Sequence, residues 1–475
     1  MKIKNLVVAL SILFFSCQQD IEVNKNEKVI APISDQVLET AVIYEANIRQ
    51  YSKEGTFKAF TKDIPVLKEL GVKVIWLMPI NPISEIKRKA TDGSFTSEIE
   101  DEEERKKYLG SYYSVSDYKA INPEFGDKAD FKELIETAHK NSIYVIVDWV
   151  PNHTGWDHPW ITNHPDWYTQ NEKGEIIDPI NPDTGKSWGW TDTADLNYDN
   201  LDMQQEMIKD LKYWVKNFDI DGYRMDVAHK VPPVFFNEAI SELKKIKPIF
   251  MLAEAEQHDL FRNGFDMQYA WEGHHILNSI AKGEATASDF DTYMNKQNEL
   301  LEPSDFNMNF VTNHDENSWS GTVKERMGAA SEILTTLVYT IPGMPLIYSG
   351  QEYDLNHRLK FFEKDSIPKT KGATWDLLTK LGDLKNNHAA FHGGKSAASY
   401  ERLSTQNEKV VAFKRSNEEV EAYFIGNLSN EEQVFSINLE GDYKDLLQNK
   451  NIEFKLDKLT LSPWNYYLVS KNNNE

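Results

Sequence analysis

The chain has 475 residues, of which 40% are apolar and 12% aromatic, a composition typical of folded globular proteins rather than disordered ones. Its 75 acidic residues outnumber the 52 basic ones, giving a formal charge of −23. That charge argues against nucleic acid as a partner, because phosphates are neutralised by an excess of Lys and Arg. A neutral ligand, bound through hydrogen bonds and stacking, fits this composition better. The length allows two or three domains, although a single α/β barrel can exceed about 250 residues.

The N-terminal residues have the features of an export signal. Lys2 and Lys4 precede an apolar run over residues 6–15, which has signal-peptide length and is too short to span a bilayer. Ser16 then precedes Cys17, the one cysteine of the sequence, and this pair resembles the lipobox of bacterial lipoproteins. In a lipobox the cysteine becomes the lipidated first residue after cleavage, which leaves no thiol for a disulfide, a nucleophile or a zinc site. The alternatives are an ordinary signal peptide and a cysteine that stands there by chance.

We therefore expect an exported protein anchored by lipid to the cell envelope. The outer membrane is the expected site, and the sequence leaves the side of that membrane open. Residues 1–17 would be the signal segment, and the polar, unpatterned residues 18–38 would form a flexible tether.

Apolar strands alternate with amphipathic helices over residues 39–394. Helices are expected at residues 55–71, 128–141, 202–217 and 233–246, the first ending at Gly71. Strands are expected to begin near residues 40, 73, 143, 220, 248, 264, 307 and 344. Nearly continuous apolar strands are typical of a parallel sheet covered on both faces. Eight such units predict a TIM-type (β/α)8 barrel, an α/β fold.

Two insertions interrupt the barrel pattern, and a third segment follows it. Residues 81–111 contain the acidic run "EIEDEEERKK", which predicts a solvated helix or loop. Residues 155–200 predict a small irregular subdomain after the third strand. From residue 395 to 475, short alternating runs such as "KVVAFKRS" predict a C-terminal antiparallel β-sandwich. The subdomain carries five tryptophans, for which a small core is favoured over sugar-stacking platforms: Trp156, Trp160, Trp167, Trp188 and Trp190.

Polar residues gather where four of the predicted strands end, which is where reactive groups lie in such barrels. In "FDIDGYRMDVAHK", Arg224 and Asp226 are two residues apart and share one strand face. A buried arginine and a buried carboxylate are costly unless paired. Glu254 ends the next strand, so the carboxylates of Asp226 and Glu254 are expected at the same height on adjacent strands. "DWVPNH" ends the third strand, and "NHDEN" follows the seventh.

Paired carboxylates at this height suit glycosidic bond cleavage with retention. That chemistry needs one ionised carboxylate as nucleophile and one protonated carboxyl as acid, roughly 5–5.5 Å apart. Arg224 is expected to keep Asp226 ionised by charge pairing. Burial among Met251 and Leu252 is expected to raise the pKa of Glu254.

Four stretches resemble the signature regions of the α-amylase family of glycoside hydrolases: "DWVPNH", "GYRMD", "MLAEAE" and "FVTNHD". The resemblance extends from about residue 40 to 470. It implies that Asp226 is the nucleophile, Glu254 the general acid/base and Asp315 the acid that holds and distorts the sugar. The choice of Glu254 over Glu256 depends on this alignment.

The resemblance also implies a set of substrate-binding residues. Six are close to family positions or spacings: Tyr113, His153, Arg224, His314 and the D-x-x-x-R pair Asp354 with Arg358. The family commonly ends the nucleophile region in Lys-His, which contacts sugar on the leaving-group side. Here His229 and Lys230 stand in the reverse order, so specificity on that side stays open.

Many members of the family bind a structural Ca²⁺ between barrel and subdomain. Asn152 and Asp195 match two of its ligand positions, and a backbone carbonyl near Lys230 matches another. Oxygen ligands are those that Ca²⁺ prefers. The resemblance therefore implies calcium as a cofactor, with the remaining ligands unplaced.

The expected function is retaining hydrolysis of α-1,4-glucosidic linkages in starch-like glucans or maltooligosaccharides. An α-glucan transglycosylase or isomerase is an alternative, because such enzymes of this family use the same residues. A non-catalytic cell-surface glycan-binding lipoprotein is less favoured, since a pure binder has no need for a buried acid pair.

Overall fold

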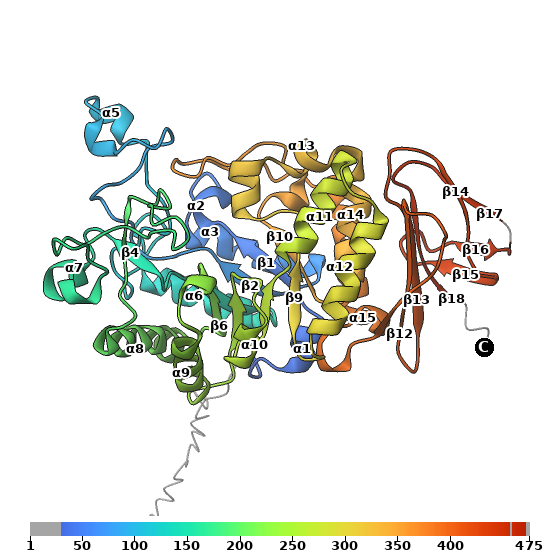
Figure 1. Cartoon of the computed structure of the whole chain (residues 1–475), viewed down its shortest axis with the longest axis horizontal. Coiled ribbons are helices and arrows are strands. Elements are labelled where there is room, and N and C mark those ends of the chain that lie inside the picture. The colour runs from blue at the N-terminus through green and yellow to red at the C-terminus, as the bar shows by residue number, and fades with distance from the viewer. Residues whose placement is uncertain (1–29, 457, 472–475) are drawn as a thin grey trace, which may run out of the picture.

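The computed structural model describes residues 30–456 and 458–471 (Figure 1). Eight parallel strands close into a barrel in the order β1-β10-β9-β8-β7-β6-β3-β2. They are β1 (Val42–Ala46), β2 (Val72–Leu77), β3 (Tyr144–Trp149), β6 (Gly222–Met225), β7 (Phe250–Ala253), β8 (Met267–Tyr269), β9 (Phe306–Asn309) and β10 (Met344–Tyr348). Each starts within three residues of a predicted strand start, so the TIM-type barrel is confirmed.

The apolar strands follow from burial on both faces of the sheet. Ile43, Trp76 and Ile146 belong to an apolar cluster inside the barrel, whereas their neighbours Tyr44 and Ile75 pack in the cluster that includes the helices. Successive strand residues point to opposite faces, so both phases of the alternation must be apolar.

Helices surround this barrel. The longer ones are α6 (Lys128–Lys140), α8 (Leu201–Phe218), α9 (Pro233–Lys244), α11 (Trp271–Lys282), α12 (Ala287–Leu300), α14 (Ser331–Thr340) and α15 (Ala373–Asn387). The shorter ones are α1 (Asp35–Glu39), α2 (Ile48–Tyr51), α3 (Phe57–Thr61), α4 (Ile64–Leu67), α10 (Asp259–Arg262) and α13 (Val323–Met327).

The helix expected over residues 55–71 is divided into α3, α4 and a 3₁₀ turn. Pro65 stands in the first turn of α4, where its missing N–H costs no helical hydrogen bond. Gly71 ends the segment with φ 74°, the left-handed conformation predicted for a helix C-terminus.

The predicted tether is too long at its C-terminal end. Ile33 and Leu38 are buried in the apolar cluster inside the barrel, and the hydroxyl of Tyr144 donates to the carbonyl of Ala31 at 3.1 Å. Residues 30–38 therefore pack against the barrel, because they carry apolar side chains that cover one of its ends. Residues 18–29 and the proposed lipidation site at Cys17 lie outside the described residues.

Both insertions lie on the left in Figure 1, on the side of the barrel away from the C-terminal sheets. The first carries α5 (Glu102–Arg105), whose four residues are all unburied, as its acidic sequence predicts. The second contains α7 (Pro159–Asn163) and the paired strands β4 (His153–Gly155) and β5 (Thr193–Asp195).

The C-terminal segment forms antiparallel sheets, as expected. Six strands make one sheet in the order β11-β12-β13-β18-β15-β16, and β14 pairs with β17 in another. Their bounds are β11 (Ser399–Arg402), β12 (Val410–Ser416), β13 (Glu421–Asn427), β14 (Gln433–Ser436), β15 (Gly441–Asp445), β16 (Asn451–Phe454), β17 (Lys458–Leu461) and β18 (Tyr466–Lys471). Within residues 30–456 and 458–471, no helix has the length and apolarity needed to cross a membrane.

Candidate active site

The barrel places the predicted acids side by side. Asp148 on β3 is in register with Arg224 on β6, and Arg224 is in register with Leu252 on β7. The backbone N–H of Glu254 donates to the carbonyl of Met225 at 3.0 Å, which sets Glu254 beside the end of β6. The expectation that Asp226 and Glu254 share one level on adjacent strands is confirmed.

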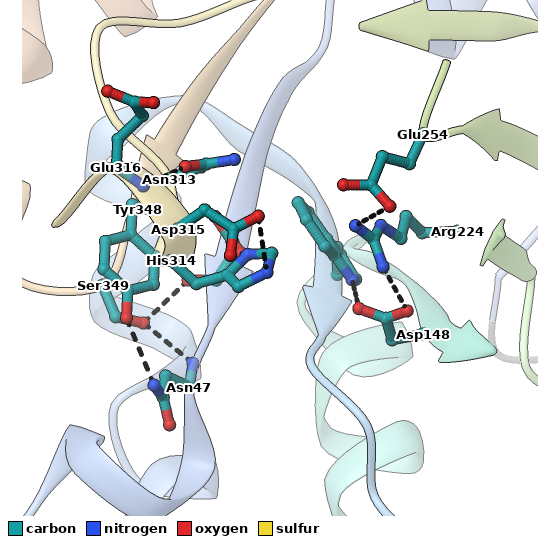
Figure 2. Close-up of polar contacts among 12 residues, drawn as sticks. Asn47, Asp148, Arg224, Glu254, Asn313, His314, Asp315, Glu316, Tyr348 and Ser349 are labelled. Atoms are coloured by element: carbon teal, nitrogen blue, oxygen red, sulfur yellow. Dashed lines mark hydrogen bonds and ion pairs between the residues drawn. The ribbon is translucent and has the colours of Figure 1, made fainter. Parts of the chain in front are cut away.

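Arg224 links three carboxylates. Its Nη1 lies 2.7 Å from Oδ1 of Asp226 and 2.8 Å from Oδ1 of Asp148, and its Nη2 lies 3.0 Å from Oε2 of Glu254. Figure 2 shows Arg224 between Glu254 and Asp148. The Arg224 side chain is 0% exposed, so these ion pairs are desolvated and each partner is needed to balance the others.

Two of these buried carboxylates, Asp148 and Asp226, hold protons more tightly than exposed carboxylates do. Burial raises the pKa of Asp148 to about 6, and Arg224 opposes that rise. Burial also raises the pKa of Asp226, with the charges of Glu254 and Asp148 adding to the rise and Arg224 opposing it. Arg224 therefore favours the ionised form of Asp226, but burial has the larger effect and the net pKa of Asp226 is raised, contrary to the expectation that this pairing alone keeps Asp226 ionised.

Glu254 is fixed from two sides. Besides the ion pair with Arg224, its Oε2 accepts a hydrogen bond from the backbone N–H of Val227 at 2.6 Å. Val227 has φ 45° and ψ 40°, a left-handed conformation that is strained for a β-branched residue. Strain of this kind persists where the surroundings fix the backbone, and here it aims the amide at Glu254. Glu256, the neighbouring acid, instead accepts from the backbone N–H of Glu272 at 2.7 Å.

His314 and Asp315 stand opposite Arg224. Nε2 of His314 lies 2.8 Å from the hydroxyl of Tyr113 and 3.3 Å from Oδ2 of Asp315, while Nδ1 lies 2.5 Å from Oε1 of Glu45. Burial alone would lower the pKa of His314, but the charges of Asp315 and Glu45 outweigh it and raise that pKa to about 9. His314 is therefore a cation at neutral pH, and it presents hydrogen-bond donors beside Asp315.

His153 is a neutral donor on the subdomain side. Burial lowers the pKa of His153 to about 3. The side-chain amide of Asn152 lies 3.1 Å from Nδ1, and Nε2 makes no hydrogen bond to the described residues. If Asn152 Nδ2 donates to Nδ1, the neutral ring carries its proton on Nε2.

These groups line one cavity of about 330 Å³. Two aromatic surfaces face it. Tyr113 stacks with Phe361 at 6.4 Å between ring centroids, and Trp319 packs on Phe361 at 5.1 Å. Trp190 lies 5.8 Å from the His153 ring on the subdomain side. The complete lining is Lys89, Ser111, Tyr113, His153, Trp190, Asp192, Thr193, Asp226, Val227, Glu254, His314, Asp315, Trp319, Phe361 and Phe362.

The structure does not bring five of the predicted binding residues into the lining of this cavity. Arg224 is one of them, because its buried side chain binds the acids instead. Asp354 has φ 56° and lies in a separate groove, where Thr374 donates to it. Arg358 donates to Glu325 at 3.0 Å. The D-x-x-x-R pair is therefore divided between other partners, which corrects the prediction that it binds sugar beside the catalytic acids. His229 is exposed, and Lys230 places Nζ 3.7 Å from the centroid of the Trp188 ring.

The five tryptophans of the subdomain form two contacting pairs and one separate residue. Trp160 and Trp167 are buried and meet edge to face at 4.9 Å, so the prediction of a small core is confirmed for them. Trp188 is 41% exposed and stacks with Trp190 at 5.9 Å. For this second pair the core interpretation is wrong, because Trp188 is exposed and Trp190 lines the cavity. Trp156 is half-buried.

Asn152 and Asp195 lie close together as the calcium hypothesis requires. The carbonyl of Asn152 accepts from the backbone N–H of Leu196 at 3.1 Å, and β4 pairs with β5 directly beside it. Burial raises the pKa of Asp195 to about 6, and the hydroxyl of Thr169 donates to its Oδ2 at 2.7 Å. A cation there would relieve the cost of that burial. Across residues 30–456 and 458–471, however, no group of three or more His, Cys, Asp or Glu side chains is arranged to hold a metal.

Several contributors were not predicted from the sequence. Glu45 is the penultimate residue of β1, and Trp76 lies on β2, where its indole N–H donates to Asp148 at 3.1 Å. A carboxylate inside the apolar run "VIYEANI" was a usable signal for Glu45. Lys89 and Asp192 lie in irregular insertions, which carry no periodicity from which a site position could be read.

Comparison with known proteins agrees with this geometry. The family model "Alpha amylase, catalytic domain" matches residues 34–390. Alpha-amylase 3 of Dictyoglomus thermophilum is 25% identical over 90% of this chain and 93% of its own length. The 4-alpha-glucanotransferase of Thermotoga neapolitana is 27% identical over 63% of this chain and 67% of its own length. The crystal structure of an alpha-amylase from Lactobacillus plantarum superposes with a TM-score of 0.79 at 28% identity, covering 92% of this chain and all of that one.

Proposed function

The chain belongs to the α-amylase family of glycoside hydrolases, and we propose that it hydrolyses α-1,4-glucosidic linkages of starch-like glucans or maltooligosaccharides with retention of anomeric configuration. The observation that carries this proposal is the sharing of one guanidinium by Asp226 and Glu254, at 2.7 and 3.0 Å. Two carboxylates bound to neighbouring nitrogens of one group are close enough to act on a single glycosidic bond.

In the first step the carboxylate of Asp226 attacks the anomeric carbon, and the glycosidic C–O bond breaks. The departing oxygen takes a proton from the carboxyl of Glu254. In the second step Glu254 removes a proton from water, whose oxygen displaces Asp226 and restores both side chains. His314 and Asp315 bind the sugar hydroxyls, and the anions of the cluster stabilise the positive charge that develops at the anomeric carbon.

The test uses maltoheptaose, with the anomeric configuration of the first products followed by NMR. We expect α-anomeric products from the wild type and a loss of at least about a thousandfold in turnover for Asp226→Asn and Glu254→Gln. Near-ultraviolet circular dichroism should show that both variants remain folded. Turnover of Asp226→Asn near the wild-type value would contradict the assignment.

Transglycosylation is the second candidate, since a sugar hydroxyl replaces water in the same second step. The similarity of this chain to a 4-alpha-glucanotransferase supports transglycosylation as a candidate function. Longer glucans formed when maltose is added as acceptor would assign the transferase activity, whereas shorter products alone would assign hydrolysis.

We also propose a calcium ion held by Asn152, Asp195 and the backbone carbonyl at residue 230. Such an ion would join the barrel to the subdomain and balance the buried carboxyl of Asp195. Calcium should raise the melting temperature of the apo wild type and leave that of Asp195→Asn unchanged. Equal melting temperatures of the wild type with calcium and with a chelator would exclude the site.

Lipid anchoring at Cys17 is proposed from the sequence of residues 2–17. Metabolic labelling with a radioactive fatty acid in a bacterial host should mark the wild type and not Cys17→Ala. An unlabelled wild type that is nevertheless exported would favour an ordinary signal peptide.

A further inference from the structure

The two insertions of the barrel are joined beside the catalytic cavity. Nζ of Lys89, in the first insertion, lies 3.2 Å from Oδ1 of Asp192 in the subdomain, and the same ammonium donates to the carbonyl of Gly189. The hydroxyl of Ser114 donates to the carbonyl of Asp192 at 2.7 Å. The segments around residues 89 and 192 therefore form one connected structure, which we call the bridge.

Further contacts continue the bridge away from the cavity. The backbone N–H of Glu85 donates to Asp157 at 2.8 Å, and Nζ of Lys87 lies 3.3 Å from the centroid of the Trp156 ring. Gly155 packs so tightly that an added Cβ would lie 2.4 Å from the Cβ of Ser84. These contacts between two irregular segments hold them in one arrangement.

The central ion pair is well shielded from water. The side chain of Lys89 is 14% exposed and that of Asp192 is 8% exposed. Burial raises the pKa of Asp192, and Lys89 opposes that rise. A shielded pair of this kind contributes little net stability but fixes geometry, because breaking it leaves one buried charge without a partner.

The bridge also positions aromatic rings. Gly189, whose carbonyl accepts from Lys89, lies between Trp188 and Trp190, and Trp190 lines the cavity. Lys89 and Asp192 line the same cavity as Asp226 and Glu254. The bridge is thus part of the wall of the catalytic cavity, whose lining also includes Trp319 and Phe361.

A cavity of small volume accepts a short ligand. Its volume of about 330 Å³ is near the lower end of ligand sites, which run from roughly 300 to 1,000 Å³. A long glucan needs a groove that is open at both ends, and the Lys89–Asp192 pair joins the two insertions in the wall of this cavity, where it limits the room for further sugar units.

We infer that the Lys89–Asp192 ion pair determines substrate length, making the enzyme select short maltooligosaccharides over the interior of long glucan chains. This inference rests on the proposed function of the same site. Lys89 and Asp192 thus act in substrate specificity, whereas Asp226 and Glu254 carry out the catalytic chemistry.

The experiment measures kcat/KM for maltotriose and for amylose with the wild type and with Lys89→Ala, Asp192→Asn and the charge-exchanged double variant Lys89→Asp/Asp192→Lys. The wild type should prefer maltotriose. Each single variant should shift the amylose-to-maltotriose ratio toward amylose by about tenfold, the size of effect expected from one pocket contact. The exchanged pair should recover part of the preference. Lys106→Ala is the matched control, because Lys106 lies in the same insertion directly after α5 with a side chain that is 60% exposed.

The measurements distinguish a failure of length selection by the ion pair from a failure of the proposed glucan hydrolysis. A wild type that acts on neither substrate would overturn the proposed function. An active wild type that prefers amylose, or single variants with an unchanged ratio, would overturn the role of the pair while the function stands. The wild-type preference is decisive even where a single variant fails to fold.

Discussion

Nη1 of Arg224 lies 2.7 Å from Oδ1 of Asp226, and the two side chains come from residues two apart at the end of β6. The strand alternation puts both on the same face, and the barrel adds Asp148 and Glu254 from the strands on either side. One cation thereby organises three carboxylates, which makes Arg224 a positioning residue for both catalytic acids.

Arg224→Met should destabilise the fold strongly. Removing one partner from a buried charge network costs about 3–5 kcal/mol, because the remaining charges are left without compensation. The measurement is the free energy of unfolding from urea denaturation. Arg262→Met is the control, since Arg262 pairs with Glu302 and Asp305 through a side chain that is 50% exposed and should lose less than about 1 kcal/mol. Similar losses in the two variants would contradict the network.

The stability contributed by His314 should depend on pH with a defined sign. The folded-state pKa of His314 is raised to about 9, above the ordinary value of roughly 6.5. Protonation therefore favours the folded state: the contribution is complete below about pH 6.5 and is lost as pH rises through about 9. The difference in unfolding free energy between wild type and His314→Gln should be larger at pH 6 than at pH 10. An NMR titration that shows the imidazole losing its proton below pH 7 would rule this out.

Arg415 should hold the C-terminal sheet to the barrel. Its side chain is 0% exposed and donates to the carbonyl of Thr340 in the barrel at 2.7 Å, and to those of His392, Ala398 and Ser399 at 3.0–3.1 Å. Arg415→Lys keeps a charge but cannot reach all four carbonyls, so a loss of about 2–4 kcal/mol is expected. Thermal unfolding measures it, with Lys414→Met on the same strand as control. An unchanged melting temperature would show that these hydrogen bonds are dispensable.

Gly155→Ala should disturb the bridge without touching an ionisable group. The new Cβ would lie 2.4 Å from Cβ of Ser84 and 3.0 Å from the carbonyl oxygen of Ser114. The segments must separate, so the melting temperature should fall and the amylose-to-maltotriose ratio should rise, as in Lys89→Ala. Ser84→Gly removes the clashing atom, and the double variant should recover part of both changes. Wild-type behaviour of Gly155→Ala would mean that the two segments move apart freely.

Much of the barrel and of its reactive centre was predictable from local sequence. A strand buried on both faces must be apolar throughout, so eight apolar segments between helices identify eight strands without knowledge of their partners. Parallel strands of a barrel end at one rim, so polar residues at strand ends converge whatever the loops do. Asp226, His314 and Asp315 were located in this way, whereas the choice of Glu254 over Glu256 and the family roles came from the signature stretches.

The tertiary structure alone decided the contacts that depend on loop paths. The side chain of Asp354 turns into another groove although its spacing to Arg358 fits the family, and Glu45 contacts His314 from the first strand of the barrel. The Lys89–Asp192 pair joins two segments without regular secondary structure. Periodicity reports which face of an element is buried, but the partner of a side chain in a loop is set by packing between segments far apart in the chain.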